Sequence, residues 1–216
     1  VEEYVFDYLP KDRMYVMLWQ NDNAIIIGKN QNTLAEINEA YVKEQGIRVV
    51  RRLSGGGAVY HDMGNLNFTW ITDAGDASQV DLGKFCRPVA EALRALGADA
   101  QVSGRNDILI DGQKISGNAQ YVRDGRVMHH GTLLFDADLS VLGNALKVDP
   151  AKIQAKGVRS VRSRVTTIRP HLASGITLAD LQRRILEHLF PAGITEYPLT
   201  NADIASVEAI KRARYD

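Results

Sequence analysis

The sequence predicts an α/β fold of the α+β kind, in which a mixed β-sheet is flanked by helices. Three observations predict it. Strand-like and helix-like segments alternate without the regular rhythm of βαβ units, two Asp-Gly pairs separate short β-rich runs, and the last third of the chain is mostly helical in pattern. No linker rich in Pro, Gly or Ser and no internal repeat divides the 216 residues, so we expect one domain over residues 1–216.

The first half of the chain predicts short helices and strands in alternation. Residues 1–9 carry apolar side chains at helical spacing. The capping-box pattern Thr33-x-x-Glu36 predicts the start of a helix over about 33–45, and the clearest amphipathic helix covers 81–96. Strands are expected in the β-rich runs at 14–19, 24–28, 47–51 and 66–71.

The second half adds two hairpins and four helices. Asp111-Gly112 and Asp124-Gly125 each separate two β-rich runs, and Asp-Gly is a favoured pair in two-residue hairpin turns. Helical patterns follow at about 138–146, 149–155, 177–190 and 201–213.

Composition excludes several classes of protein. The 26 basic and 26 acidic residues give a formal net charge of zero, which argues against nucleic-acid binding through overall charge. The single cysteine can form neither an internal disulfide nor a cysteine-rich zinc site. No apolar run approaches the roughly 20 residues that cross a bilayer. We therefore expect a soluble, cytoplasmic small-molecule enzyme or binding domain that binds neither membrane nor nucleic acid.

The glycine motif RRLSGGGAVYHD (51–62) is the most unusual stretch. Three consecutive glycines let a backbone approach a ligand closely and present its N–H groups. The motif lacks the Gly-Lys-Ser/Thr of a Walker loop and the glycine spacing of a dinucleotide fingerprint. A flexible β-loop is the plain alternative. Arg51 and Arg52 before the loop and His61-Asp62 after it favour instead a site for a carboxylate or phosphate.

A second motif, GRNDILIDGQKISGNAQ (104–120), places Lys114 two residues after a hairpin turn. A lysine there is ordinarily a solvated surface residue, but Gly117 in the same strand indicates close approach by a ligand or another backbone. Asn106 and Asp107 open the partner strand. They could hold a metal ion or a nucleotide, and Asp107 could equally serve only to start the strand.

The third motif, VMHHGTLLF (127–135), is an apolar strand that contains His129 and His130. Strand alternation points the two side chains to opposite faces, which argues against a shared zinc ion. We expect at least one of the two histidines to be structural.

The fourth motif, AKIQAKGVRSVRSRVTTIR (151–169), has no acidic residue. Its six basic residues are Lys152, Lys156, Arg159, Arg162, Arg164 and Arg169. This local excess of positive charge requires an anion or a large solvated face. A nucleotide triphosphate, an adenylate and a nucleic acid are the candidate anions, although few aromatic residues are interleaved for base stacking.

In this order and at these separations, the four motifs resemble those of lipoate–protein ligases over nearly the whole chain. The resemblance implies a biotin/lipoate-ligase catalytic fold, similar to class II synthetase cores. It implies that ATP and Mg²⁺ activate lipoate as lipoyl-AMP, and that the lipoyl group passes to a lysine of a carrier domain. The carriers would be acyltransferase subunits of 2-oxoacid dehydrogenases and the glycine-cleavage H protein. A first strand and a C-terminal accessory domain, which is a separate chain in some relatives, would be absent here.

The same resemblance implies roles for single residues. Lys114 would be catalytic and contact the acyl carbonyl and the phosphate, and Asp107 would lie near Mg²⁺. Residues implied to bind the nucleotide or adenylate are Arg52, Gly57, Ala58, Val59, Tyr60, Asn106, Asp107, Lys114 and Ala119. Residues implied to bind lipoate are Ser54, Gly55, Gly56, Gly57, His61, Lys114 and His130. The adenylate-binding loop would be 155–169, and the acyl tunnel would be lined around Val59, Leu66 and Leu133.

Alternatives stay open at this point. An ATP-independent octanoyl or lipoyl transferase of the same fold works through a cysteine thioester, whereas Cys86 lies on the apolar face of the 81–96 helix. A biotin ligase would carry a GRGR-type loop, which is missing. From another class, a non-catalytic module could bind nucleic acid through 151–169 or bind lipoate, but the retained Lys114 counts against a decayed enzyme.

Overall fold

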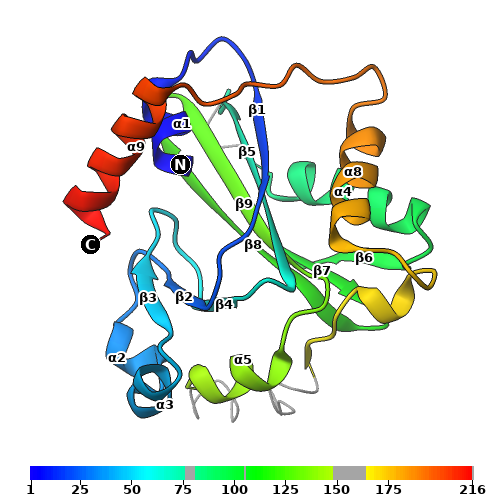
Figure 1. Ribbon diagram of the computed structural model, residues 1–216. Coiled ribbons are helices and arrows are strands. Elements are labelled where there is room, and N and C mark those ends of the chain that lie inside the picture. Colours follow the sequence, from blue (N-terminus) through cyan, green and yellow to red (C-terminus); the bar gives the residue numbers. More distant parts are fainter. Residues whose placement is uncertain (76–80, 105, 148–163, 216) are drawn as a thin grey trace.

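Two β-sheets form the framework of the protein (Figure 1). The computed structural model describes residues 1–75, 81–104, 106–147 and 164–215, and every structural statement below refers to these residues. The larger sheet is antiparallel throughout and has the order β1 (Tyr15–Trp19), β5 (Asn65–Asp73), β9 (Arg126–Leu134), β8 (Gln113–Arg123), β7 (Asp107–Ile110), β6 (Ala100–Ser103). The smaller sheet has the order β3 (Arg48–Arg51), β2 (Ala24–Ile27), β4 (Val59–His61). Strand β2 pairs parallel with β3 and antiparallel with β4, so the mixed pairing lies in this sheet.

Helices cover both sheets (Figure 1). They are α1 (Glu2–Tyr8), α2 (Thr33–Glu36), α3 (Glu39–Glu44), α4 (Gly83–Ala95), α5 (Leu139–Ala145), the 3₁₀ turn η2 (Arg169–His171), α8 (Leu178–Leu189) and α9 (Asn201–Arg214). Helices α4 and α8 pack on one face of the large sheet, α1 and α9 lie together on the other face, and α3 and α5 cover the small sheet. The predicted α+β class is confirmed. No helix in the described ranges is long and apolar enough to cross a membrane.

Strand β5 shows how sequence alternation separates the core from the site. Leu66, Phe68 and Trp70 point to one face and pack with α4 and α8 in the largest apolar core. The residues between them, Asn67 and Thr69, point to the other face and are equally buried. A polar stripe is therefore buried on the side of the large sheet that faces the small one.

The expected helix over 33–45 is wrong in its extent, because the chain forms two short helices there. Asn32 caps α2 by accepting a hydrogen bond from Leu34 N, and Asn38 caps α3 by accepting one from Tyr41 N. Between the two helices Ile37 is extended and pairs with the end of α5. Thr33 is thus the first residue of α2 and not a capping residue. The expected helix at 149–155 lies outside the described residues.

Arg126 anchors α1 to the large sheet. Its side chain is 1% exposed, and its guanidinium donates hydrogen bonds to the carbonyl oxygens of Val5 (3.1 Å), Phe6 (2.6 Å), Leu9 (3.1 Å) and Pro10 (3.1 Å). These carbonyls lie at the C-terminal end of α1, where backbone acceptors lack helical partners and the helix dipole favours a cation. Anchoring α1 also fixes Glu2, which reaches the site described below.

Replacing Arg126 with methionine is expected to lower the free energy of unfolding by about 3 kcal/mol or more, because several buried carbonyls lose their donor. Urea unfolding measures this loss. Arg123 on the preceding strand is the matched control, since its side chain is 42% exposed and forms an ion pair with Asp7. Arg123→Met is expected to cost less than about 1 kcal/mol. Equal losses in the two variants would contradict the anchoring role.

Candidate active site

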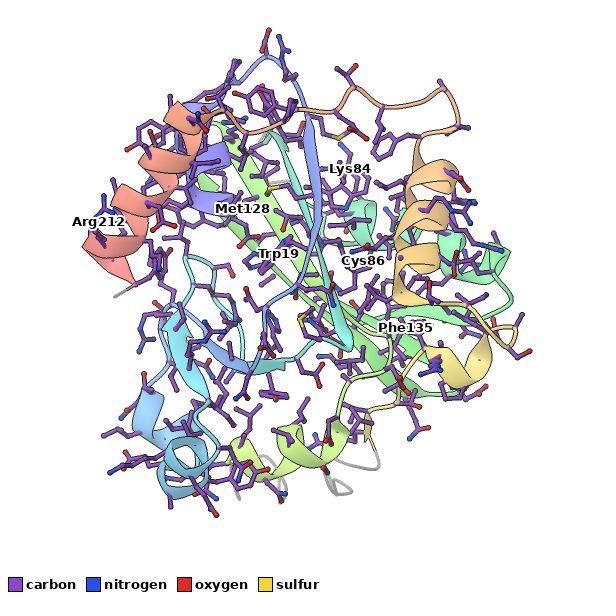
Figure 2. All side chains as sticks on the ribbon, in the orientation of Figure 1. Trp19, Lys84, Cys86, Met128, Phe135 and Arg212 are labelled. Atoms are coloured by element: carbon purple, nitrogen blue, oxygen red, sulfur yellow. The ribbon has the colours of Figure 1, made fainter. Side chains whose placement is uncertain are left out.

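A cavity of about 150 Å³ lies between the two sheets and brings the sequence motifs together. Strands β5, β8 and β9 form its floor, and the glycine motif with β2 and β4 covers it. Predicted site residues that line it are Arg52, Gly56, Gly57, Ala58, Val59, His61, Asn106, Lys114, Ala119 and His130. The other lining residues are Glu2, Trp19, Ile26, Asn67, Gly117, Asn118, Gly131 and Thr132. Trp19, at the end of β1, is labelled in Figure 2.

Arg52 shapes the glycine loop from inside. Its Nη2 donates to the carbonyl oxygens of Gly55 (2.7 Å) and Gly57 (2.8 Å), its Nη1 to that of Ile26 (3.0 Å), and its Nε to Ser54 Oγ (3.0 Å). The loop bends at Gly56, whose φ of +91° is unfavourable for other residues. Burial lowers the pKa of Arg52, but an arginine stays protonated at neutral pH. Carbonyl oxygens of the loop therefore surround the permanent positive charge of Arg52.

A chain of hydrogen bonds runs from the glycine loop to the end of the cavity near α1. Ser54 Oγ lies 2.6 Å from His130 Nε2, and His130 Nδ1 lies 2.9 Å from Glu2 Oε1. The same carboxylate oxygen accepts a hydrogen bond from Thr69 Oγ1 (2.6 Å), which accepts one from Trp19 Nε1 (2.9 Å). Burial alone would raise the pKa of Glu2, but the contacts with His130 and Thr69 outweigh it and hold the pKa below its usual value. Glu2 is therefore an anion at neutral pH.

Lys114 occupies a different part of the cavity. Its Nζ lies 2.8 Å from Asp107 Oδ1, and both side chains are about one-third exposed. The ammonium packs over Gly117, where an added Cβ would come within 2.9 Å of Nζ. The carbonyl of Lys114 accepts a hydrogen bond from Thr166 N (3.0 Å), so the strand that carries the lysine also contacts the end of the basic motif. Within that motif, residues 151–163 lie outside the described residues.

Four predicted site residues do not line the cavity. Ser54 and Gly55 support the loop through Arg52, and Asp107 reaches the cavity only through its ion pair with Lys114. Tyr60 points away from the cavity, into the core of the small sheet, where its hydroxyl donates to Asn23 Oδ1 (3.1 Å).

The predicted lining of the acyl tunnel needs correction. Leu66 and Leu133 are fully buried in the core on the α4 face, because strand alternation turns them away from the cavity. Val59 does line the cavity. The other apolar side chains of the lining belong to Trp19, Ile26 and Ala58.

The two adjacent histidines face opposite sides of the sheet, as predicted. His130 joins the hydrogen-bond chain of the cavity, whereas His129 is buried beside Cys86 with Asn118 Oδ1 at 3.2 Å from its Nε2. Burial lowers the pKa of His129 to about 3 and that of His61, at the cavity, to about 4. Both His129 and His61 are therefore neutral in the folded protein at neutral pH.

Acidification below about pH 6.5 is expected to destabilise the protein through His61 and His129. The unfolded chain takes up these protons near pH 6.5, whereas the folded chain does so only near pH 4 and pH 3. The unfolded state therefore binds more protons in between, and each histidine lowers the free energy of unfolding by up to about 1.4 kcal/mol per pH unit. Urea unfolding at a series of pH values checks this. His129→Gln should show the shallower slope, and a slope unchanged from wild type would contradict the assignment.

Two carboxylates lie at or beside this cavity: Glu2, which lines it and is engaged by His130 and Thr69, and Asp107, which reaches it only through Lys114. No group of three His, Cys, Asp or Glu side chains in the described ranges is arranged to hold a metal ion. Mg²⁺ often binds proteins through one or two carboxylates and takes its other ligands from substrate phosphates and water. A single carboxylate beside an ammonium fits a magnesium ion that arrives with a nucleotide and does not fit a resident metal centre.

Comparisons with known proteins agree with the motifs. Residues 1–190 match the family model described as the lipoyl protein ligase A/B catalytic domain. Lipoate-protein ligase LplJ of Bacillus subtilis is 48% identical over 220 residues, which covers 100% of this chain and 66% of that protein. Lipoate–protein ligase 1 of Staphylococcus aureus is 44% identical over 216 residues, again with 100% and 66% coverage. The chain thus spans just under two-thirds of the length of these relatives.

Solved structures show the same architecture. A bipartite lipoate protein ligase of Thermoplasma acidophilum, described together with its E2 lipoyl domain, matches with a TM-score of 0.85 and 28% identity over 99% of this chain and 86% of that one. A lipoate-protein ligase A bound with ATP matches with a TM-score of 0.82 and 25% identity over 99% of this chain and 88% of that one.

Proposed function

Because the chain belongs to the lipoyl protein ligase A/B catalytic domain family, we propose that it activates lipoate with ATP and transfers the lipoyl group to a carrier domain. The observation that carries the proposal is the distribution of charge along one cavity. The ammonium of Lys114 and the carboxylate of Glu2 both line it, with the apolar side chains of Trp19, Ile26 and Val59 among the other lining residues.

This distribution orients a fatty acid. Lys114 attracts the carboxylate of the acid, and the ionised Glu2 repels it, so the carboxylate lies at the Lys114 end and the acyl chain extends toward Glu2. The glycine loop lets the backbone approach the bound molecule closely, because no side chain intervenes at Gly56 or Gly57.

In the first half-reaction, a carboxylate oxygen of lipoate attacks the α-phosphorus of ATP. The bond to the bridging oxygen breaks, and pyrophosphate leaves with the electron pair. Negative charge develops on the phosphoryl oxygens, and the ammonium of Lys114 is placed to stabilise it. For this, the ammonium of Lys114 must leave its ion pair with Asp107 and bind the phosphate instead. Asp107 and Asn106 would hold Mg²⁺ together with phosphate oxygens, and the ion would neutralise phosphate charge.

In the second half-reaction, the amine of a carrier lysine attacks the acyl carbonyl of lipoyl-AMP. An amide bond forms, the bond between the carbonyl carbon and the phosphate oxygen breaks, AMP leaves with the electron pair, and the nitrogen releases one proton to solvent. No nucleophile of the enzyme is required. Lys114, which lines the cavity, would donate to the carbonyl oxygen and the leaving phosphate. The proposed carriers are lipoyl domains of 2-oxoacid dehydrogenases and the glycine-cleavage H protein, and the proposed location of the reaction is the cytoplasm.

The basic motif and an accessory domain are proposed to complete the adenylation step. Arg164 lies next to Val165, which pairs with the Lys114 strand, so the basic motif reaches the phosphate end of the cavity. The archaeal ligase described as bipartite supports an accessory domain that is supplied by a separate chain. Transfer from preformed lipoyl-AMP would then need residues 1–216 alone.

The cysteine-dependent transferase is disfavoured by the position of Cys86. Its side chain is fully buried on α4, on the face of the sheet opposite the cavity (Figure 2). Burial raises the pKa of the thiol to about 12, so the nucleophilic thiolate does not form at neutral pH.

Isotope exchange between pyrophosphate and ATP tests the proposal directly. Exchange that depends on lipoate is expected, with the accessory domain of a relative added if residues 1–216 alone are slow. Biotin should not support exchange. Lipoyl transfer to a carrier domain in the absence of ATP, from an acyl carrier protein, would overturn the proposal and favour the transferase.

A further inference from the structure

Two buried nitrogen atoms at the cavity have no hydrogen-bond partner within the described residues: Asn67 Nδ2 and His61 Nε2. The side chain of Asn67 is 2% exposed and that of His61 4% exposed, and both line the cavity. An unpaired N–H group in such a position costs free energy unless a ligand or water accepts its hydrogen bond.

Both nitrogens are donors. Asn67 Oδ1 already accepts a hydrogen bond from Asn65 Nδ2 (3.0 Å), which leaves the NH₂ group of Asn67 free to face the cavity. Asn21 Nδ2 lies 3.2 Å from His61 Nδ1 and donates to it. A neutral imidazole carries one proton, and His61 is neutral because burial lowers its pKa to about 4, so the proton is on Nε2.

The sheet register gives the position of these donors relative to Lys114. On β5, Asn67 is paired with Trp19 of β1 on one side and Thr132 of β9 on the other. Thr132 Oγ1 accepts a hydrogen bond from Gly117 N of β8 (3.2 Å), and Lys114 packs over Gly117. Two strand spacings, roughly 10 Å, therefore separate Asn67 from Gly117, over which the ammonium packs. This is about the length of an extended eight-carbon acyl chain.

An aromatic side chain lies beside His61. The ring of His61 meets the indole of Trp19 edge-on, with ring centroids 6.0 Å apart. The indole N–H of Trp19 is engaged by Thr69, so the ring offers its surface and not its donor to the cavity. The end of the cavity far from Lys114 thus combines two unpaired N–H donors with one aromatic surface.

Given the proposed function, we propose that Asn67 and His61 form a subsite for the sulfur atoms of the dithiolane ring and make the enzyme select lipoate over octanoate. Divalent sulfur accepts weak hydrogen bonds and packs favourably against aromatic rings. The methyl end of octanoate fills the same space but leaves both donors unpaired. A site built to hydrogen-bond a substrate discriminates against an analogue that lacks the acceptor.

The first test uses the wild-type protein and three acids: lipoate, octanoate and 5-cyclopentylpentanoate, which keeps the ring and replaces both sulfur atoms by carbon. Calorimetry is expected to give the carbocyclic acid an affinity about tenfold below that of lipoate, close to the affinity of octanoate. Equal affinities of the two cyclic acids would overturn the sulfur subsite. Failure to bind any of the three acids would overturn the proposed function instead.

The second test is Asn67→Leu, which keeps the number and branching of the side-chain heavy atoms and removes the donor. The ratio of kcat/KM for lipoate to that for octanoate in pyrophosphate exchange is expected to fall about fivefold to tenfold. Because both acids are measured on the same protein, a loss of stability cancels from the ratio. Gln101→Leu, which removes an exposed amide on β6 away from the cavity, is the matched control and should leave the ratio unchanged. A parallel fall for both acids in Asn67→Leu would assign Asn67 a purely structural role.

Discussion

Replacing Lys114 with alanine is expected to lower the rate of lipoate-dependent pyrophosphate exchange by about a thousandfold, the upper end of the effect of removing one donor to developing charge. The physical reason is the position of its ammonium, which lines the cavity beside Gly117 and is the cation closest to Asp107 among the described residues. Lys114→Arg should recover little of the rate, since a planar guanidinium does not match the space over Gly117.

The fold should tolerate the loss of Lys114. Its ion pair with Asp107 is partly exposed, and such pairs contribute at most about 1 kcal/mol. Urea unfolding would confirm that the variant is folded. Lys84→Ala is the matched control, because Lys84 is an exposed lysine on α4, away from the cavity (Figure 2). An Lys114→Ala protein that is folded and exchanges pyrophosphate within tenfold of wild type would remove Lys114 from the mechanism.

Gly28→Ala is expected to lower kcat/KM about a hundredfold, because it displaces the glycine loop by an ångström or more. A Cβ on Gly28 would lie 2.1 Å from the carbonyl oxygen of Gly56, and that carbonyl belongs to a loop that Arg52 holds on both sides. The loop cannot keep its position when the methyl group is added. Steady-state kinetics with lipoate measures the effect.

The glycine motif supplies its own control for this variant. Gly55 has no atom within 4 Å of an added Cβ and has an ordinary φ, so Gly55→Ala should leave kcat/KM within about threefold of wild type. If the two variants lose activity equally, chain stiffness and not the approach of Gly28 to Gly56 explains the loss. If neither loses activity, the position of the loop does not matter for catalysis.

Local patterns predicted most of the secondary structure. The Asp-Gly turns, the amphipathic α4 and the capped α8 and α9 follow rules that act within a few residues, and the structure has all of them. The prediction of a single helix over 33–45 is wrong for a reason that is also local. The side chains of Asn32 and Asn38 compete for backbone donors and start two helices where the capping-box pattern at Thr33 predicts one. Strands β4 and β6 are short and depend on their sheet partners for stability.

The parts of the candidate site that lie within recognisable sequence motifs were predictable. The glycine loop, Lys114 and His130 were named from sequence, and the structure brings them to one cavity. Glu2 and Trp19 were missed, because they enter the site from α1 and β1 and only the fold brings these elements there. One signal in the sequence points to a buried polar surface there: Asn67 and Thr69 interrupt an otherwise apolar strand, and the structure buries both on the face opposite the apolar core.

A crystal structure of the protein with a non-hydrolysable lipoyl-adenylate analogue tests the central claim most directly. We expect the acyl–phosphate linkage between the glycine loop and Lys114 Nζ, the dithiolane ring at Trp19, His61 and Asn67, and the ion pair between Lys114 and Asp107 broken or lengthened. An adenylate bound elsewhere, or bound here with its acyl chain directed away from Glu2, would contradict a site in which one cavity activates the acid and orients it by charge.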